Sequence, residues 1–202
     1  TFLRDVFAVM ALCPEHTFQV LTKRAHVLPL WLTEDFADGV EWSANVHAHF
    51  RGARYHQPEF RWPLPNVWLG VTAEDQKRAD SRIPDLLRTK AAVRFVSLEP
   101  LLQPVYLHQV ALAHGFVINS LEQNTVGRCG RIEKWKPLDW IIIGAESGPN
   151  RRPMELEWAI DLVRQCQAAG VACFVKQIPV NGKVSKDLNE WPEELRVREY
   201  PR

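Results

Sequence analysis

Five short apolar runs recur along the chain, and each one ends in a cluster of polar or charged residues. The runs are residues 18–21, 67–71, 93–98, 140–144 and 172–175. Uninterrupted apolar runs of this length are typical of strands that are buried on both faces of a parallel sheet. Apolar residues at helical spacing predict helices over residues 3–12, 75–88 and 155–169. The alternation predicts an α/β fold of parallel βα repeats that forms an open sheet or an incomplete TIM-like barrel.

The pattern predicts a single α/β domain over residues 1–202. Residues 39–65 contain prolines and histidines without a regular period, so we expect a long loop there. Residues 113–137 are polar and mixed, which indicates an insertion, and residues 181–202 should form a C-terminal tail. The helical pattern is already established at Leu3 and residue 1 is not Met. We therefore expect an N-terminally truncated chain, with a natural start after removal of Met as the alternative.

Composition narrows the choice of partners and compartment. Apolar residues make up 46% of the chain and charged residues 24%, which is enough for a core and ordinary for a globular domain. The formal net charge of +1 gives no support to a nucleic-acid partner, although that alternative stays open. No apolar run approaches the roughly 20 residues of a membrane helix, and no signal peptide is visible, so no membrane partner is expected. The four cysteines are scattered without a C-x-x-C pair, which predicts reduced thiols in a cytoplasmic protein.

Three glutamates follow predicted strands directly: Glu74, Glu99 and Glu146. Because the carboxyl ends of parallel strands meet on one side of a sheet, these side chains should converge on one mouth. Converging carboxylates can bind a divalent cation, act as acid and base, or hold ammonium and hydroxyl groups. The structural alternative is that each glutamate caps a helix or pairs with a nearby Lys or Arg.

The same mouth should carry cations and a glycine turn. Lys23, Arg24 and Lys176 follow strands and can hold a carboxylate or a phosphate, or else remain solvated loop charges. Residues 143–149 form a glycine-containing strand-to-helix turn whose backbone amides can approach a ligand. This turn lacks the G-x-G-x-x-G spacing and the Walker A lysine pattern, and Ser147 is not in a G-x-S-x-G elbow. The motifs therefore favour neither a nucleotide-binding signature nor a serine hydrolase.

Six ordered segments resemble a known family. They are FQVLTKR at 18–24, PNVWLGV at 65–71, RFVSLEPLL at 94–102, GAESGP at 144–149, RPM at 152–154 and FVKQ at 174–177. Together they resemble an uncharacterised protein family of phages and bacteria whose sequences are similar to radical S-adenosylmethionine proteins. The resemblance extends over nearly the whole chain and implies a radical-SAM-like partial barrel, but it does not imply a particular reaction.

The resemblance also implies cofactors for a longer form of the protein. In that family a cysteine cluster with a C-x-x-C pair lies upstream of the region seen here. Three thiolates of such a cluster would hold a four-iron centre and leave one iron open for the amino and carboxylate groups of S-adenosylmethionine. This chain contains no such motif. The resemblance therefore implies S-adenosylmethionine and an iron–sulfur cluster for the full-length protein and assures neither for these 202 residues.

Roles for residues at the predicted mouth follow from the same resemblance. It implies that seven residues face the mouth, without saying which of them bind a cofactor: Lys23, Thr72, Glu74, Glu99, Glu146, Ser147 and Lys176. We predict catalytic roles for Glu99, Glu146 and Lys176, and cofactor binding by Lys23, Thr72, Glu74, Gly144 and Ser147. By analogy with radical enzymes, Gly144 and Glu146 would contact the methionine or adenosine part of the cofactor, an assignment that rests on fold-level analogy alone. No residue is assigned to a metal ion.

Three functions follow as hypotheses. The first is the downstream part of a radical-SAM-like barrel enzyme of a phage-type family, with an unknown substrate for which nucleic acid is one candidate. The second is a cluster-free module that binds macromolecules on the barrel scaffold. The third is a metal-assisted hydrolase that uses the strand-end glutamates. An incomplete barrel would also leave an open sheet edge, which the long loop, the tail or a second copy of the chain in a homo-oligomer would cover.

Overall fold

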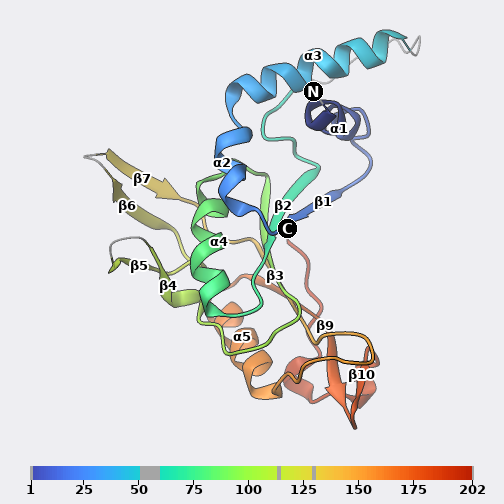
Figure 1. The fold of residues 1–202 in the computed structure, drawn as a ribbon, viewed down its shortest axis with the longest axis vertical. Helices are drawn as coiled ribbons and strands as arrows, with labels where there is room; N and C mark the ends of the chain where they lie inside the picture. Colours follow the sequence, from blue (N-terminus) through green and yellow to red (C-terminus); the bar gives the residue numbers. More distant parts are fainter. Residues whose placement is uncertain (1, 51–59, 113–114, 129–130, 202) are drawn as a thin grey trace.

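A six-stranded sheet forms the centre of the protein. The computed structural model describes residues 2–50, 60–112, 115–128 and 131–201 (Figure 1). The strands lie in the order β1-β2-β3-β8-β9-β10. Their bounds are β1 Phe18–Thr22, β2 Val67–Thr72, β3 Val93–Leu98, β8 Trp140–Gly144, β9 Ala172–Val180 and β10 Lys183–Ser185. The first five are parallel and β10 is antiparallel to β9. The predicted α/β class with a mostly parallel sheet is confirmed, and the sheet is curled and open, as a half-barrel.

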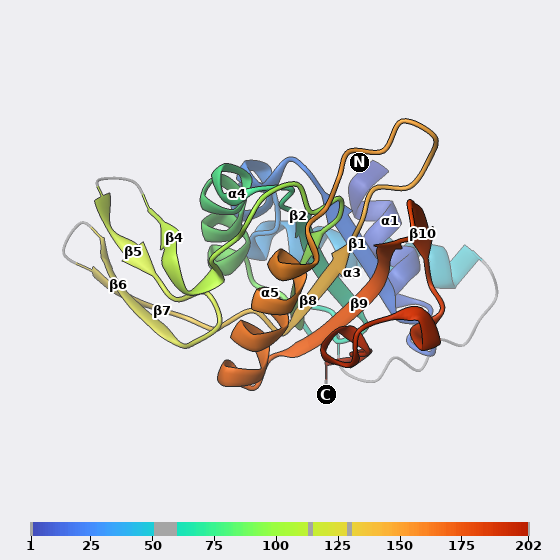
Figure 2. The ribbon, with the colours of Figure 1, turned by 90° about the horizontal axis from the view of Figure 1, so that it is seen from below.

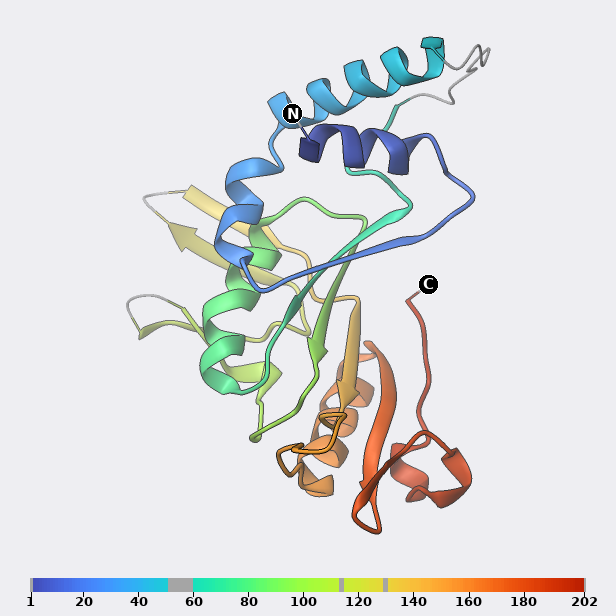
Figure 3. The ribbon, with the colours of Figure 1, turned by 45° about the vertical axis from the view of Figure 1, so that its right-hand side comes forward.

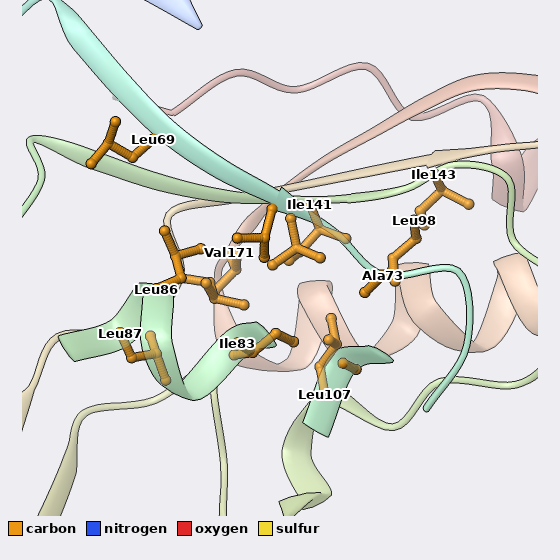
Figure 4. Close-up of a cluster of buried hydrophobic side chains, with 14 of the residues drawn as sticks. Leu69, Ala73, Ile83, Leu86, Leu87, Leu98, Leu107, Ile141, Ile143 and Val171 are labelled. Carbon is orange, nitrogen blue, oxygen red and sulfur yellow. The ribbon is translucent and has the colours of Figure 1, made fainter. Parts of the chain in front are cut away.

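The helices lie on the outer face of this half-barrel and at one of its ends (Figures 1 and 2). The helices are α1 Phe2–Ala11, α2 Leu28–Trp31, α3 Glu34–Phe50, α4 Gln76–Arg88 and α5 Leu156–Ala169. α4 packs on β2 and β3, and α5 packs on β8 and β9. Figure 4 shows the resulting core, in which Ile83 and Leu86 of α4 face Ile141 of β8. The half-barrel therefore has a helix-covered outer side and an inner, concave side.

Local sequence explains where α4 and α5 begin and end. The Asp75 side chain accepts a hydrogen bond from the backbone N–H of Arg78 at 2.9 Å and so caps α4. The helix continues through Pro84. Gly170 ends α5 with a φ of 68°, a left-handed conformation that glycine adopts without the steric cost of a Cβ. The apolar period of both segments correctly predicted these helices.

The predicted loop over residues 39–65 is wrong for its first part, because α3 extends from Glu34 to Phe50. Phe36, Val40 and Ala44 recur every four residues and are buried, so they form the inward stripe of this helix. Phe7 of α1 packs edge-on against Phe36, with ring centroids 5.4 Å apart. Residues 51–59 of the predicted loop lie outside the described residues.

The predicted insertion over residues 113–137 overlaps two hairpins between β3 and β8. β4 Val110–Ala111 pairs with β5 Val117–Ile118, and β6 Asn124–Arg128 pairs with β7 Arg131–Trp135. Figure 2 shows both hairpins projecting from the body beyond α4 and α5. One 3₁₀ turn, η2 Leu107–Gln109, precedes β4.

The C-terminal tail closes one edge of the sheet. After β10 it forms two 3₁₀ turns, η4 Leu188–Glu190 and η5 Glu193–Leu195. It then runs beside the first half of β9, where Val175 N–H donates to Val197 O at 2.9 Å and Glu199 N–H donates to Cys173 O at 2.8 Å. Figure 3 shows this segment ending beside the concave side of the sheet. None of the described helices combines the length and apolar character that a membrane crossing requires.

Candidate functional site

The carboxyl ends of the five parallel strands lie along one end of the half-barrel, which we call the rim. The structure places all eight predicted site residues there, at or just after the ends of β1, β2, β3 and β8 or in β9: Lys23, Thr72, Glu74, Glu99, Gly144, Glu146, Ser147 and Lys176. Lys176 lies inside β9, because this strand continues to Val180 through its pairing with β10. The chemical roles of these residues stay predictions.

Glu74 is held by two cations that come from different elements. Lys23 Nζ lies 2.8 Å from Glu74 Oε1, and Arg82 Nη1 of α4 lies 2.9 Å from Oε2. Arg82 Nη1 also donates to Thr72 Oγ1 at 2.8 Å, and that hydroxyl donates to Glu74 Oε1 at 3.3 Å. Burial disfavours the carboxylate, but the hydrogen bond from Lys23 and the charge of Arg82 outweigh it and lower the pKa of Glu74 to about 2. Glu74 is therefore anionic and fully paired at neutral pH.

A second ion pair joins Glu99, which follows β3, to Lys176 of β9. Lys176 Nζ lies 3.0 Å from Glu99 Oε1 and 3.1 Å from Oε2. β8 lies between these strands, and Gly144 at its end leaves room for the glutamate. A Cβ at position 144 would stand 3.0 Å from Glu99 Cγ, Cδ and Oε1. The space above Gly144, where a ligand was expected to approach the backbone, is thus filled by the Glu99 side chain.

The guanidinium group of Arg152 binds both carboxylate oxygens of Glu146. Its Nε and Nη2 donate to Glu146 Oε2 and Oε1 at 2.8 and 2.6 Å, and its backbone N–H donates to Oε2 at 2.7 Å. These hydrogen bonds lower the pKa of Glu146 to about 2, and the same contact raises the pKa of Arg152. Ser147 beside it is exposed. Because Arg152 donates to both carboxylate oxygens and lowers the pKa, Glu146 is a weak base as long as this ion pair is intact.

The concave side carries a set of aromatic side chains, which we call the aromatic floor: Trp68, Phe95, Trp140 and Phe174. The Trp140 ring lies at the centre, 5.8 Å from the rings of Trp68 and Phe95 and 6.1 Å from that of Phe174. A cavity of about 390 Å³ lies on the concave side and reaches the Glu99–Lys176 pair. Aromatic walls with a few convergent polar groups are typical of small-molecule sites. The aromatic floor and the ion pair therefore form one candidate site.

Sequence reasoning missed both Arg82 and the aromatic floor. Arg82 lies three residues after the buried Ala79, so helical spacing alone puts it beside the inward stripe of α4. The floor follows from strand alternation, because residues two apart share a face of a sheet. Counting back from Glu99 by twos gives Ser97 and Phe95, and counting back from Lys176 gives Phe174. This signal was available in the sequence.

Comparison with known proteins identifies the family. The family model described as "Protein of unknown function (DUF5131)" matches residues 1–194. The chain belongs to the DUF5131 family. The predicted membership of an uncharacterised family is therefore consistent with this match, while a relation to radical S-adenosylmethionine proteins does not follow from it. The curated proteins and the solved structures that were compared gave no match.

The described cysteines of this DUF5131 chain do not fit an iron–sulfur cluster. Cys13 precedes β1, Cys173 lies near the start of β9, and Cys166 lies towards the end of α5, so all three are at the opposite end of the sheet from the rim. The hydrogen bond with Cys173 and burial raise the pKa of the Cys166 thiol, which disfavours the thiolate that iron needs. Cys129 lies outside the described residues. No step through a cluster is derived from these residues.

Proposed function

We propose that the rim and the concave side form the binding site of an enzyme whose ligand carries both an ammonium and a carboxylate group, with S-adenosylmethionine as the candidate. The observation that carries this proposal is the Glu99–Lys176 pair at the mouth of the cavity. The Glu99 side chain is 19% exposed and that of Lys176 is 48% exposed, so a ligand can reach both charges. An aminocarboxylate offers the complementary pair of charges. Glu99 would accept from the ligand's ammonium group, and Lys176 would donate to its carboxylate.

Energetics support a binding role for this pair. An ion pair that is partly open to solvent adds only about 0–1 kcal/mol to stability. Exchange of one partner for a ligand group of the same charge therefore costs the fold little. Glu74 is different, because it is 12% exposed and bound to two cations, so we assign it to the support of the rim. Glu146 is likewise bound by Arg152, so we also assign it to the support of the rim.

S-adenosylmethionine fits the chemistry of this donor set. Its aminocarboxylate end matches Glu99 and Lys176, and its heteroaromatic end matches the aromatic floor beneath them. When bound, this molecule supplies a sulfonium-activated carbon for transfer or cleavage. The residues of this chain would bind and orient it, and no step through an iron–sulfur cluster is part of the proposal.

The metal-assisted hydrolase is less well supported. The three strand-end glutamates belong to three separate ion pairs, with Lys23 and Arg82, with Lys176, and with Arg152. Among the described residues, no group of three His, Cys, Asp or Glu side chains is placed to hold one ion. A divalent cation at these glutamates would have to displace their Lys and Arg partners.

Calorimetric titration of the chain with S-adenosylmethionine tests the proposal. Lys176→Ala and Glu99→Gln should each weaken binding by about tenfold or more, since a hydrogen bond to a charged group is worth about 1.5–3 kcal/mol. Lys183→Ala, which removes an exposed lysine from β10, is the matched control and should bind as the unaltered chain does. Absence of binding at millimolar ligand, or equal affinity of Lys176→Ala and the control, would contradict the proposal. If the chain binds S-adenosylmethionine but catalyses no reaction of it, the result would favour a cluster-free binding module over an enzyme.

A further inference from the structure

The cavity on the concave side has the size and walls of a site for a planar ring. Its volume is about 390 Å³, near the lower end of the roughly 300–1,000 Å³ of small-molecule sites. Phe95, Trp140 and Phe174 of the aromatic floor line it, together with Tyr200 from the C-terminal tail. Aromatic rings attract one another in offset-stacked or edge-on arrangements, so these walls favour a flat aromatic ligand over an aliphatic one.

One polar group inside this cavity lacks a hydrogen-bond partner. Ser97 lines the cavity and is only 5% exposed. Within the described parts of the chain, its backbone carbonyl accepts from Ala73 N–H at 2.9 Å, whereas its hydroxyl has no bonded partner. The hydroxyl is open to the cavity and can bond to water there, since the buried polar atoms without a partner among the described residues are Trp62 Nε1 and Trp191 Nε1. A ligand that covers Ser97 Oγ without bonding to it would leave it unpaired at a cost of about 1–3 kcal/mol. A ring that hydrogen-bonds to this oxygen avoids that cost, and a purely carbocyclic ring does not.

Tyr200 lies against two rings of the aromatic floor at the edge of the cavity. Its ring centroid is 5.5 Å from those of Trp140 and Phe174, so no third ring fits between them, and the residue is 59% exposed. The tail is fixed to the sheet one residue before this position, because Glu199 N–H donates to Cys173 O at 2.8 Å and Trp140 Nε1 donates to Glu199 O at 2.9 Å. The backbone is therefore anchored while the tyrosine ring remains accessible at the edge of the cavity.

We propose that this cavity binds a heteroaromatic ring of nucleobase size, with the ring in contact with Trp140, Tyr200 beside it and Ser97 Oγ hydrogen-bonded to a ring heteroatom or exocyclic group. The inference extends the proposed function, because the cavity reaches the same Glu99–Lys176 pair. Such a ring can belong to S-adenosylmethionine or to a separate nucleoside substrate. Stacking on aromatic side chains is worth about 1–3 kcal/mol per base and does not depend on net protein charge.

Tryptophan fluorescence gives a direct readout, since Trp140 forms part of the cavity wall. We would titrate the chain with adenosine, guanosine, cytidine and uridine, and with toluene as a ring that has no heteroatom. Ser97→Ala should weaken binding of the responding nucleoside by about tenfold and should not weaken toluene binding, because only the nucleoside uses the hydroxyl. Ser81→Ala, an exposed serine on α4, is the matched control and should change neither.

A second variant pair tests the stacking part. Tyr200→Ala should weaken binding of both the nucleoside and toluene, whereas Tyr200→Phe should restore both, because the ring and not the hydroxyl contacts the ligand. Failure of all four nucleosides to bind at millimolar concentration would overturn the inference. So would equal nucleoside affinity of Ser97→Ala and Ser81→Ala.

Repeating the titration with saturating S-adenosylmethionine assigns the source of the ring. Loss of adenosine binding under these conditions assigns the subsite to the adenine of that molecule, and retained nucleoside binding assigns it to a separate substrate. Different results would contradict the proposed function and the ring subsite. Binding of S-adenosylmethionine that depends on Lys176 but not on Ser97 or Tyr200 would sustain the proposed function and contradict the ring subsite.

Discussion

The carboxyl group of Glu99 lies against Gly144 of the neighbouring strand, where a Cβ would stand 3.0 Å from Glu99 Oε1. The glycine thus determines where the glutamate can lie, and through it the position of the ion pair with Lys176. This relationship separates two properties that are often linked, the stability of the strand and the geometry of the site.

Gly144→Ala should change the site more than the fold. The new methyl group meets only the movable end of a side chain, so we expect a change in the free energy of unfolding within about 1 kcal/mol. Glu99 must turn away, however, and affinity for S-adenosylmethionine should fall as far as it does in Glu99→Gln. Urea denaturation and calorimetry measure the two effects, and a destabilised chain with unaltered affinity would show that the glycine serves the strand only.

Gly70→Ala should have the opposite outcome. A Cβ at position 70 would lie 2.4 Å from the ring of Phe95, which is buried in the aromatic floor. Overpacking of this kind costs about 1–3 kcal/mol, measurable as a lower urea midpoint. Phe95→Leu should relieve part of the clash, so the double variant should be more stable than the two single effects predict. Additive effects would mean that the methyl group is accommodated elsewhere.

Acid should weaken the fold through Glu74. The pKa of this carboxyl is about 2 in the folded chain against an ordinary 4.5, so its ion pairs add stability above about pH 4.5, and this is lost as the pH falls towards 2. The contribution at neutral pH is at most about 3 kcal/mol. Glu74→Gln should therefore be less stable than the unaltered chain at neutral pH and almost equally stable near pH 2.

A matched substitution isolates this effect. Glu157→Gln removes an exposed carboxyl from α5 and should lower stability little at either pH. Urea denaturation of the three chains over this pH range makes the comparison. A deficit of Glu74→Gln that stayed constant down to pH 2 would show that the lost interaction does not depend on ionisation.

Removal of Arg152 should release Glu146. In Arg152→Ala the pKa of Glu146 should rise from about 2 part of the way to its ordinary value of 4.5, because the guanidinium donors are gone while the backbone N–H of residue 152 still donates to Oε2. Arg151→Ala is the control, since Arg151 donates to the carbonyl groups of Gly148 and Gly182 and not to Glu146. Carbon-13 NMR of the side-chain carboxyl over pH gives both values. An unshifted Glu146 in Arg152→Ala would assign its acidity to another group.

Much of the fold was predictable because buried parallel strands and amphipathic helices have strong sequence periods. Helix α3 was not predictable, because its inward stripe of Phe36, Val40 and Ala44 is narrow. Gly39 and Trp42, which is 70% exposed, interrupt this stripe. Glycine and an outward tryptophan both weaken the period by which a helix is recognised. Tertiary packing of α3 against α1 outweighs these local preferences.

The positions of the site residues were predictable from the sequence, but their ion-pair partners were not. Strand ends placed Glu74, Glu99 and Glu146 at the rim because parallel strands share a direction. Which cation each glutamate meets depends on how far a side chain reaches between elements, as Arg82 does from α4. That reach is a property of the assembled backbone, so helical spacing places Arg82 beside the inward stripe of α4 but does not identify its partner.

The two edges of the sheet differ in whether another segment of the chain covers them. The β9 edge is occupied by β10 and by the tail segment at residues 197–199, whereas β1 ends the strand order and, within the described residues, has no strand on its outer side. A further parallel strand can therefore join this sheet beside β1. Its carboxyl end would then fall next to Lys23, and the Lys23–Glu74 pair would change from the margin of the rim to a position between two strands.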